Sequence, residues 1–181
     1  MGRSDTVERS FFMTSPQLGF SVWRESDIAM AEKLWGDERV TRYICASGRF
    51  TKDEIAERLA LEISNGENFG VQYWPVFLSA SGEFIGCCGL RPHSGGYELG
   101  FHLRAEFWGQ GYAFEAAGAV IHYALSALGA DTLFAGHNPE NAASKKLLGK
   151  LGFQYVGDKF YPPTGLYHPS YELKKSAVTI L

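Results

Sequence analysis

The chain contains 181 residues, of which 45% are hydrophobic and 20% are charged. This composition predicts one globular domain and excludes a disordered chain. The net charge of −3 gives no basic footprint of the kind that phosphate-driven binding leaves, so we expect no nucleic-acid partner. The sequence has no apolar stretch typical of a secretory leader or a membrane helix, which predicts a cytoplasmic protein without a membrane partner.

The first half of the chain is predicted to combine helices with an antiparallel sheet. Residues 1–15 show no clear pattern, and we expect a flexible arm there, followed by one domain at 16–181. Thr51 and Glu54 form a capping box that predicts the start of a helix. Pro75 predicts an edge or a bulge in its strand. The predicted elements are a strand at 18–23, helices at 28–35 and 51–65, and a three-strand meander at 71–78, 83–90 and 97–103.

In the second half the apolar spacing becomes helical. It predicts a helix at 113–128 that ends before Gly129. Asn138, followed by Pro139, predicts the N-cap of a second helix, and Gly152 predicts its end. The predicted strands lie at 132–135, 153–156 and 171–173. Because a meander precedes these elements, the order predicts a mixed α/β domain and not a doubly wound one.

A glycine-bearing loop at the start of the long helix predicts a phosphate site. Gly109 and Gly111 allow close approach of the backbone to a ligand, and the helix start presents unpaired N–H groups and a positive dipole end. A Walker loop is excluded because its lysine is absent. A Rossmann fingerprint is disfavoured because Phe114 stands where a third glycine or alanine is needed.

Three motifs resemble the GNAT superfamily of acetyltransferases. The run 108–113, Trp-Gly-Gln-Gly-Tyr-Ala, resembles the acetyl-CoA loop of that superfamily, and together with Glu115-Ala116 it is similar to the RimJ/RimL branch. The run 141–153 resembles the second GNAT motif, and 37–44 resembles the N-terminal helical segment of that branch. The similarity covers roughly residues 18–174.

The resemblance implies a fold and a cofactor site. The implied fold is a mostly antiparallel, twisted sheet of about seven strands, flanked by about four helices and splayed between the strands at 97–103 and 132–135. The implied co-substrate is acetyl-CoA, with no metal. Main-chain groups of Phe101 and Leu103 would pair with the pantetheine arm, and the Asn141 amide would bond it. The remaining implied contacts of the cofactor are Trp108, Gly109, Gln110, Gly111, Tyr112, Ala113 and Ser144.

The acid and base are predicted less directly. Glu98, beside the expected thioester, is the first candidate for a base that deprotonates the amine, and its alternative is a surface carboxylate paired with an arginine. His102, on the same strand face, is a second candidate. Many GNAT enzymes carry a tyrosine acid where this chain has Leu148. Ser144 or a water would then protonate the thiolate.

The resemblance implies direct transfer of an acetyl group to a primary amine, either a protein N-terminus or a small molecule. None of the three cysteines lies in the motif, which favours attack without a covalent intermediate, and their spacing predicts neither a disulfide framework nor a zinc site. Segments 45–51 and 160–168 are expected to shape the acceptor pocket of a monomer or homodimer. The alternatives to an acetyltransferase are a non-catalytic acyl-CoA-binding sensor with the same fold and a nucleotide-binding module that uses the same loop.

Overall fold

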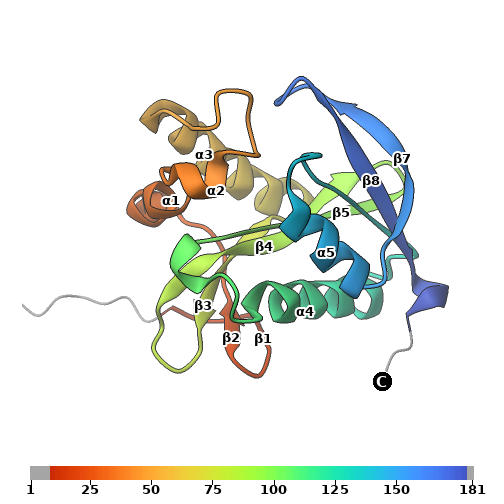
Figure 1. Cartoon of the computed structure of the whole chain (residues 1–181). Helices are drawn as coiled ribbons and strands as arrows, with labels where there is room; N and C mark the ends of the chain where they lie inside the picture. Colours follow the sequence, from red (N-terminus) through yellow and green to blue (C-terminus); the bar gives the residue numbers. More distant parts are fainter. Residues whose placement is uncertain (1–8, 179–181) are drawn as a thin grey trace, which may run out of the picture.

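The computed structural model describes residues 9–178, which form one eight-stranded sheet with helices on both faces (Figure 1). The strand order is β1-β2-β3-β4-β5-β6-β8-β7. The strands are β1 (Met13–Thr14), β2 (Leu18–Phe20), β3 (Tyr73–Leu78), β4 (Phe84–His93), β5 (Gly96–Leu103), β6 (Thr132–Gly136), β7 (Gln154–Tyr161) and β8 (Leu166–Lys174). The α-helices are α1 (Ile28–Trp35), α2 (Glu38–Thr41), α3 (Lys52–Phe69), α4 (Tyr112–Ser126) and α5 (Ala142–Lys150).

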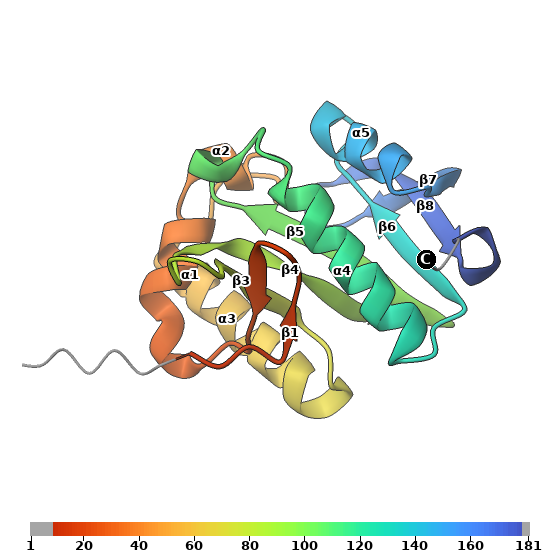
Figure 2. The same cartoon turned by 90° about the horizontal axis from the view of Figure 1, so that it is seen from below.

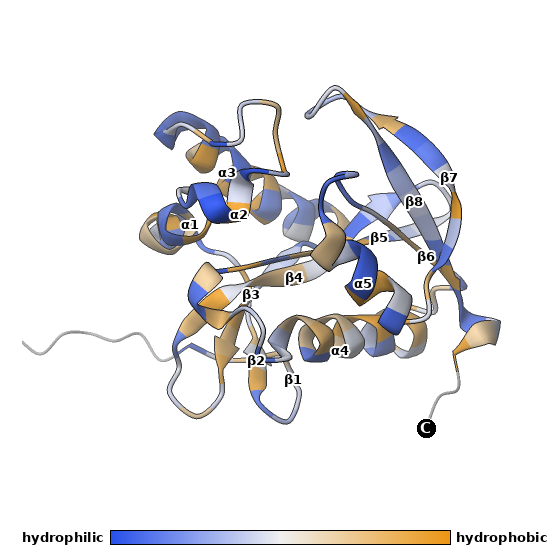
Figure 3. Cartoon of the chain, viewed as in Figure 1, coloured by the Kyte–Doolittle hydropathy of each residue, from blue (hydrophilic) through white to orange (hydrophobic). Residues whose placement is uncertain are grey.

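Each face of the sheet has its own core. Helix α4 lies along one face and α1, α2 and α3 cover the other (Figures 1 and 2). The α4 side is the larger cluster, in which Val120, Ile121 and Leu125 pack against strand residues such as Ile85 and Leu133. Figure 3 shows mostly apolar colours along α4 and hydrophilic turns on α5. No helix among residues 9–178 is long and apolar enough to cross a membrane.

The predicted fold class is confirmed, and the structure adds two short elements. All strand pairs are antiparallel except β5 with β6, and the predicted meander is β3-β4-β5. The sheet has eight strands where about seven were expected, because Met13 pairs with Phe20 in β1. The fifth helix is α2, whose N-cap Asp37 accepts a bond from the Arg39 N–H.

The position of β1 shortens the predicted arm at residues 1–15. Met13 and Thr14 belong to the sheet, and Arg9 forms an ion pair with Asp27. Residues 9–14 therefore pack on the domain. The prediction of a longer arm was wrong because it did not interpret the apolar run at 11–13 as a strand. The rest of the predicted arm, residues 1–8, lies outside the described residues.

Several predicted boundaries differ from the structure. Helix α3 continues past Gly66, where the prediction ended it, and ends at Gly70, which adopts the left-handed conformation (φ 70°). A β-carbon at Gly66 would lie 2.4 Å from the Gln72 side-chain amide, so Gly66 is needed for close packing and does not end the helix. Pro75 lies inside the sheet, and the register shift follows it, between Val76 and Phe77. Strands β7 and β8 form a longer hairpin than predicted.

The strands β5 and β6 separate after a short contact, as expected. They pair in parallel only at Tyr97 with Leu133 and at Glu98 with Phe134. Beyond Glu98 the edge of β5 faces a gap in the sheet, and this gap opens beside the loop that precedes α4.

Candidate active site

A cavity of about 1020 Å³ occupies the gap between β5 and β6 and extends to both faces of the sheet. Its wall contains every residue predicted for catalysis or cofactor binding except Gln110. The Gln110 side chain folds back and donates a hydrogen bond to the Glu106 carbonyl (3.0 Å). The other predicted residues therefore line one cavity.

The loop before α4 has the geometry of an anion site. Gly109 and Gly111 adopt positive φ angles of 73° and 86°, and a β-carbon at either glycine would meet no atom within 4 Å. Gly111 is the N-cap of α4, and no side chain caps this helix end. The N–H groups of the first turn, from Tyr112 onward, therefore face open space with the positive end of the helix dipole behind them.

The edge of β5 presents main-chain groups to the same cavity. The Arg104 N–H donates to the Ile85 carbonyl on β4 (2.8 Å). Because successive residues of a strand direct their N–H and C=O groups to opposite sides, Phe101 and Leu103 direct theirs away from β4. The Leu103 carbonyl already accepts a bond from the Trp108 indole (2.8 Å). Trp108 thus braces the loop, and the Phe101 groups and the Leu103 N–H remain for a ligand.

The start of α5 corrects one prediction. Asn141, and not Asn138, is the N-cap of this helix, and its Oδ1 accepts a bond from the Ser144 N–H (3.1 Å). Asn138 instead accepts a bond from the Glu140 N–H (3.0 Å) and forms the preceding turn. Because the cap uses only the oxygen of the Asn141 amide, its NH₂ group can still donate into the cavity that Asn141 lines.

The site contains tyrosines that the sequence motifs did not indicate. Leu148, at the position of the missing tyrosine, is buried in the core. Tyr171, on β8, lines the cavity, and its hydroxyl lies 3.1 Å from His137 Nε2. His137 Nδ1 lies 2.7 Å from the Asn138 carbonyl, which can only accept. His137 Nδ1 therefore carries the proton, and Tyr171 donates to Nε2.

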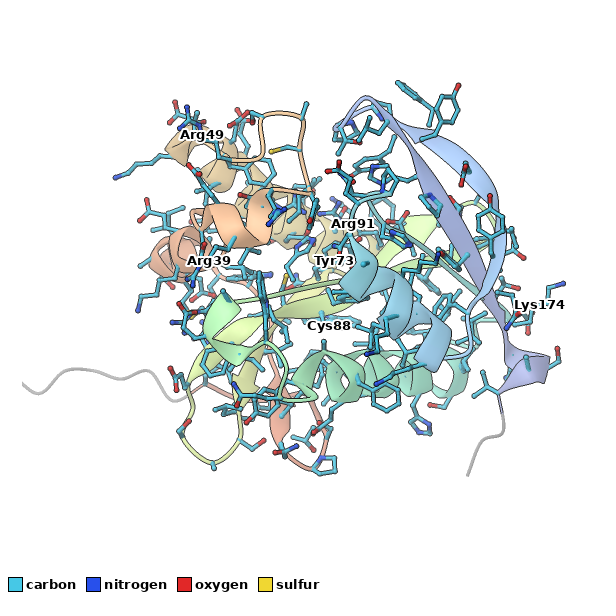
Figure 4. All side chains as sticks on the ribbon, viewed as in Figure 1. Arg39, Arg49, Tyr73, Cys88, Arg91 and Lys174 are labelled. Carbon is cyan, nitrogen blue, oxygen red and sulfur yellow. The ribbon has the colours of Figure 1, made fainter. Side chains whose placement is uncertain are left out.

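Glu98 lines the cavity, and the structure of residues 9–178 shows no arginine paired with it. Its Oε1 accepts a long bond from the Tyr73 hydroxyl (3.5 Å). Arg91 is the residue opposite Glu98 on β4, but Arg91 forms its ion pair with Glu62. The alternative of an arginine-paired surface carboxylate is therefore wrong. Figure 4 shows Tyr73 and Arg91 near the centre of the molecule, between the α1–α3 layer and the β7–β8 hairpin.

His102 is held as a neutral imidazole. Its Nδ1 lies 3.3 Å from the Trp35 indole N–H, which can only donate. Nδ1 is therefore the acceptor and Nε2 carries the hydrogen. Burial lowers the pKa of His102 well below its ordinary value, and the positive charges of Arg58 and Arg91 lower it further. A lowered pKa and an occupied Nδ1 lone pair both disfavour His102 as the base.

The neutral state of His102 has a consequence for stability. Below pH 6.5, its ordinary pKa, the unfolded chain binds a proton that the folded protein does not, so the free energy of unfolding falls as the pH falls. Between pH 7.5 and 5.5 this residue alone should cost about 1.4 kcal/mol. We expect His102→Gln to lose that part of the pH dependence in urea unfolding. An unchanged difference between the two pH values would contradict the neutral state.

Comparison with known proteins identifies the family of this site. The family model described as the acetyltransferase (GNAT) domain matches residues 17–154. The chain is a GNAT acetyltransferase. A curated relative, the uncharacterized N-acetyltransferase p20 of Bacillus licheniformis, is 32% identical over 129 residues, which cover 69% of this chain and 72% of the relative.

Solved structures share the fold of this acetyltransferase. A GNAT-family acetyltransferase from Bacillus anthracis has a TM-score of 0.77 at 22% identity and covers 92% of this chain and 99% of its own. RimJ of Mycobacterium smegmatis, in complex with CoA-disulfide, has a TM-score of 0.73 at 16% identity, over 88% of this chain and 82% of its own. The fold of this chain is therefore similar to that of RimJ, in agreement with the predicted RimJ/RimL resemblance.

The three cysteines of the acetyltransferase, all within the described residues, do not line its cavity, although Cys87 Sγ lies 3.8 Å from Nδ1 of His102, which does. Burial raises the pKa of Cys87 to about 12, so this thiol is not a ready nucleophile. Cys45 is directed to the Arg49 carbonyl (3.4 Å). The arrangement favours direct attack over an acetyl-cysteine intermediate.

The two segments expected to shape the acceptor pocket meet each other. The Ala46 N–H, in the loop between α2 and α3, donates to the Pro163 carbonyl at the tip of the β7–β8 hairpin (2.8 Å). Nearby, the Asn138 amide donates to the Tyr43 carbonyl (3.4 Å). The first bond connects the helical layer to the β7–β8 hairpin, and the second connects it to the loop between β6 and α5. We call these two bonds the bridge.

Proposed function

We propose that this acetyltransferase transfers the acetyl group of acetyl-CoA directly to a primary amine that enters the cavity from the side of α1–α3. One observation carries the proposal: a single cavity joins the uncapped start of α4 to Glu98. The first provides donors for phosphates, and the second provides a carboxylate that can accept the proton of an amine.

The residues of the cavity fit acetyl-CoA as follows. The N–H groups of Gly111, Tyr112 and Ala113 would hold the pyrophosphate. The Phe101 carbonyl and the Leu103 N–H would pair with the pantetheine arm as a further strand would. The amide of Asn141 would donate to the same arm. Acetyl-CoA supplies an activated acyl group, and the chain supplies its orientation.

The proposed reaction requires two proton transfers. The amine nitrogen attacks the thioester carbon, and its proton passes to Glu98, directly or through a water. The Phe101 N–H, directed into the gap, would donate to the oxygen that becomes negative. The carbon–sulfur bond then breaks, and the thiolate takes a proton from Ser144 or from water. A thiolate is a stable enough leaving group for a weak acid to suffice.

Replacement of Glu98 tests the base. We expect Glu98→Gln to lower kcat/KM by about 100-fold near neutral pH, because a positioned base contributes roughly 10²- to 10⁴-fold. The affinity for CoA should stay within about twofold, since Glu98 lies outside the phosphate loop. The measurement is the release of free CoA thiol from acetyl-CoA at several pH values.

The matched control is Glu67→Gln, an exposed carboxylate on α3, which should match the wild type. Glu98 would be excluded as the base if Glu98→Gln and the wild type had the same rate across the pH range.

The acceptor is a primary amine of either a small molecule or a protein N-terminus. The bridge favours the small molecule, because a folded protein surface would have to approach through the space that Ala46 and Pro163 close. Thiol release measured with small amines and with peptides as acceptors distinguishes the two. A peptide preferred over every small amine would contradict this choice.

A further inference from the structure

The wall of the cavity carries far more positive than negative charge. Seven of its lining side chains are basic and one, Glu98, is acidic, although the chain as a whole has a net charge of −3. Three of the basic residues, Arg39, Lys146 and Lys150, lie toward the phosphate loop or on α5. The other four are Arg42, Arg58, Arg91 and Lys159.

Arg58 forms no ion pair among residues 9–178, and the same holds for Arg42, Lys146, Lys150 and Lys159. Of these five side chains in the described structure, Arg58 alone has a buried nitrogen atom, its Nε, without a hydrogen-bond partner. The guanidinium lies 5.1 Å from the centre of the Trp35 ring and 5.3 Å from that of Phe50. These rings fix its position without neutralising it.

The carboxylates that helical spacing places beside Arg58 are already bound elsewhere. Glu54, one turn before it, accepts a bond from the Thr51 N–H in the capping box (2.7 Å). Glu62, one turn after it, is fully buried, accepts from the Tyr73 N–H (2.8 Å) and forms an ion pair with Arg91. A partly buried cation without a carboxylate is costly, and the cavity is where an anion could reach it.

The position of Arg58 assigns it to the acceptor and not to the cofactor phosphates. It belongs to α3, which covers the face of the sheet opposite α4 and its phosphate loop (Figures 1 and 2). Its charge acts on His102 and Tyr73, which lie deep on the α3 side. Arg58, Glu98 and Tyr73 all line the cavity, and the charges of both Arg58 and Glu98 act on the Tyr73 hydroxyl, which donates to Glu98.

We infer that the acceptor is a small amine that also carries a carboxylate, as an amino acid does, and that Arg58 binds this carboxylate while Glu98 faces the amine. The inference rests on the proposed acetyl transfer and specifies its substrate class. Arginine suits this role because its planar fork matches the two oxygens of a carboxylate.

The first test compares acceptors that differ only in the carboxylate. The probes are L-leucine, L-leucinamide and isoamylamine, and the corresponding set of L-phenylalanine, L-phenylalaninamide and phenethylamine, each with acetyl-CoA. We expect kcat/KM to be at least about 10-fold higher for the better amino acid than for its amide or its decarboxylated amine. Equal or higher values for the neutral partners would overturn the inference and leave acetyl transfer intact. No transfer to any amine would sink both.

The second test replaces Arg58. We expect Arg58→Gln to lower kcat/KM for the amino acid roughly 10- to 100-fold, to leave the amide within about twofold, and to leave the affinity for CoA unchanged. Arg58→Lys should recover part of the loss. Lys52→Gln removes the same charge from an exposed site at the start of α3 and should match the wild type.

Thermal unfolding of the variants shows whether Arg58→Gln keeps the packing on Trp35. If Arg58→Gln weakened CoA binding, or lowered the rates for amino acid and amide equally, Arg58 would not be the carboxylate site.

Discussion

Gly111→Glu should weaken the binding of CoA by at least about 1000-fold and leave the domain folded. The new carboxylate would lie among the N–H donors at the start of α4 and close to the phosphates. Two like charges about 4 Å apart in a partly exposed site repel by about 4 kcal/mol. The measurement is isothermal titration with CoA. Folding should persist because a β-carbon at Gly111 meets no atom within 4 Å.

A second glycine at the other end of α4 provides a matched control. Gly129 also has a positive φ, 66°, and open space around it, but it does not line the cavity. Gly129→Glu should therefore cost the same backbone strain, about 1 kcal/mol, and bind CoA as the wild type does. Equal CoA affinities for Gly111→Glu and Gly129→Glu would show that the loop is not the phosphate site.

Glu62→Gln should lower the free energy of unfolding by about 3 kcal/mol. Glu62 is fully buried, and its two oxygens serve Arg91 and the Tyr73 N–H. The amide keeps the shape but leaves Arg91 without its counter-charge, and removal of one partner of a buried pair costs about 3–5 kcal/mol. The lower value is expected because Arg91 is partly exposed. Urea unfolding at pH 7 measures the change.

Two further variants make this prediction specific. Glu57→Gln removes an exposed carboxylate from the same helix and should change stability by less than about 0.5 kcal/mol. The double variant Glu62→Gln, Arg91→Gln should be no less stable than Glu62→Gln alone, because the uncompensated charge is gone. Additive losses in the double variant would show that the two side chains act independently.

The parts of the structure that depend on short sequence distances were predictable. The capping box of Thr51 and Glu54 and the helix start after Gly111 follow from a few adjacent residues, and the structure contains both. The predicted phosphate loop also depends on adjacent residues, and Gly109, Gly111, Tyr112 and Ala113 of this loop line the cavity. The start of α5 shows the limit of local patterns. Asn138-Pro139 and Asn141 are both suitable N-cap sequences, but in the structure Asn138 forms the preceding turn and Asn141 caps the helix.

The parts that depend on distant residues could not be predicted. Glu62 and Arg91 are separated by 28 intervening positions, and nothing in either local pattern connects α3 to β4. The isolation of Arg58 follows from where Glu54 and Glu62 are bound, which only the packed structure reveals. The contact of Tyr171 with His137 likewise joins β8 to the end of β6. Sequence patterns therefore predicted the residues of the proposed cofactor end of the cavity, whereas the proposed acceptor end depends on tertiary packing.

Mass spectrometry of the protein and the amine, both followed during the reaction with acetyl-CoA, tests the central proposal most directly. Direct transfer predicts an amine product that gains one acetyl group while the mass of the protein stays constant throughout, and no product with Gly111→Glu. Tight CoA binding without a product from any amine would instead identify a non-catalytic sensor. An acetylated protein that forms and decays before the product appears would contradict direct attack.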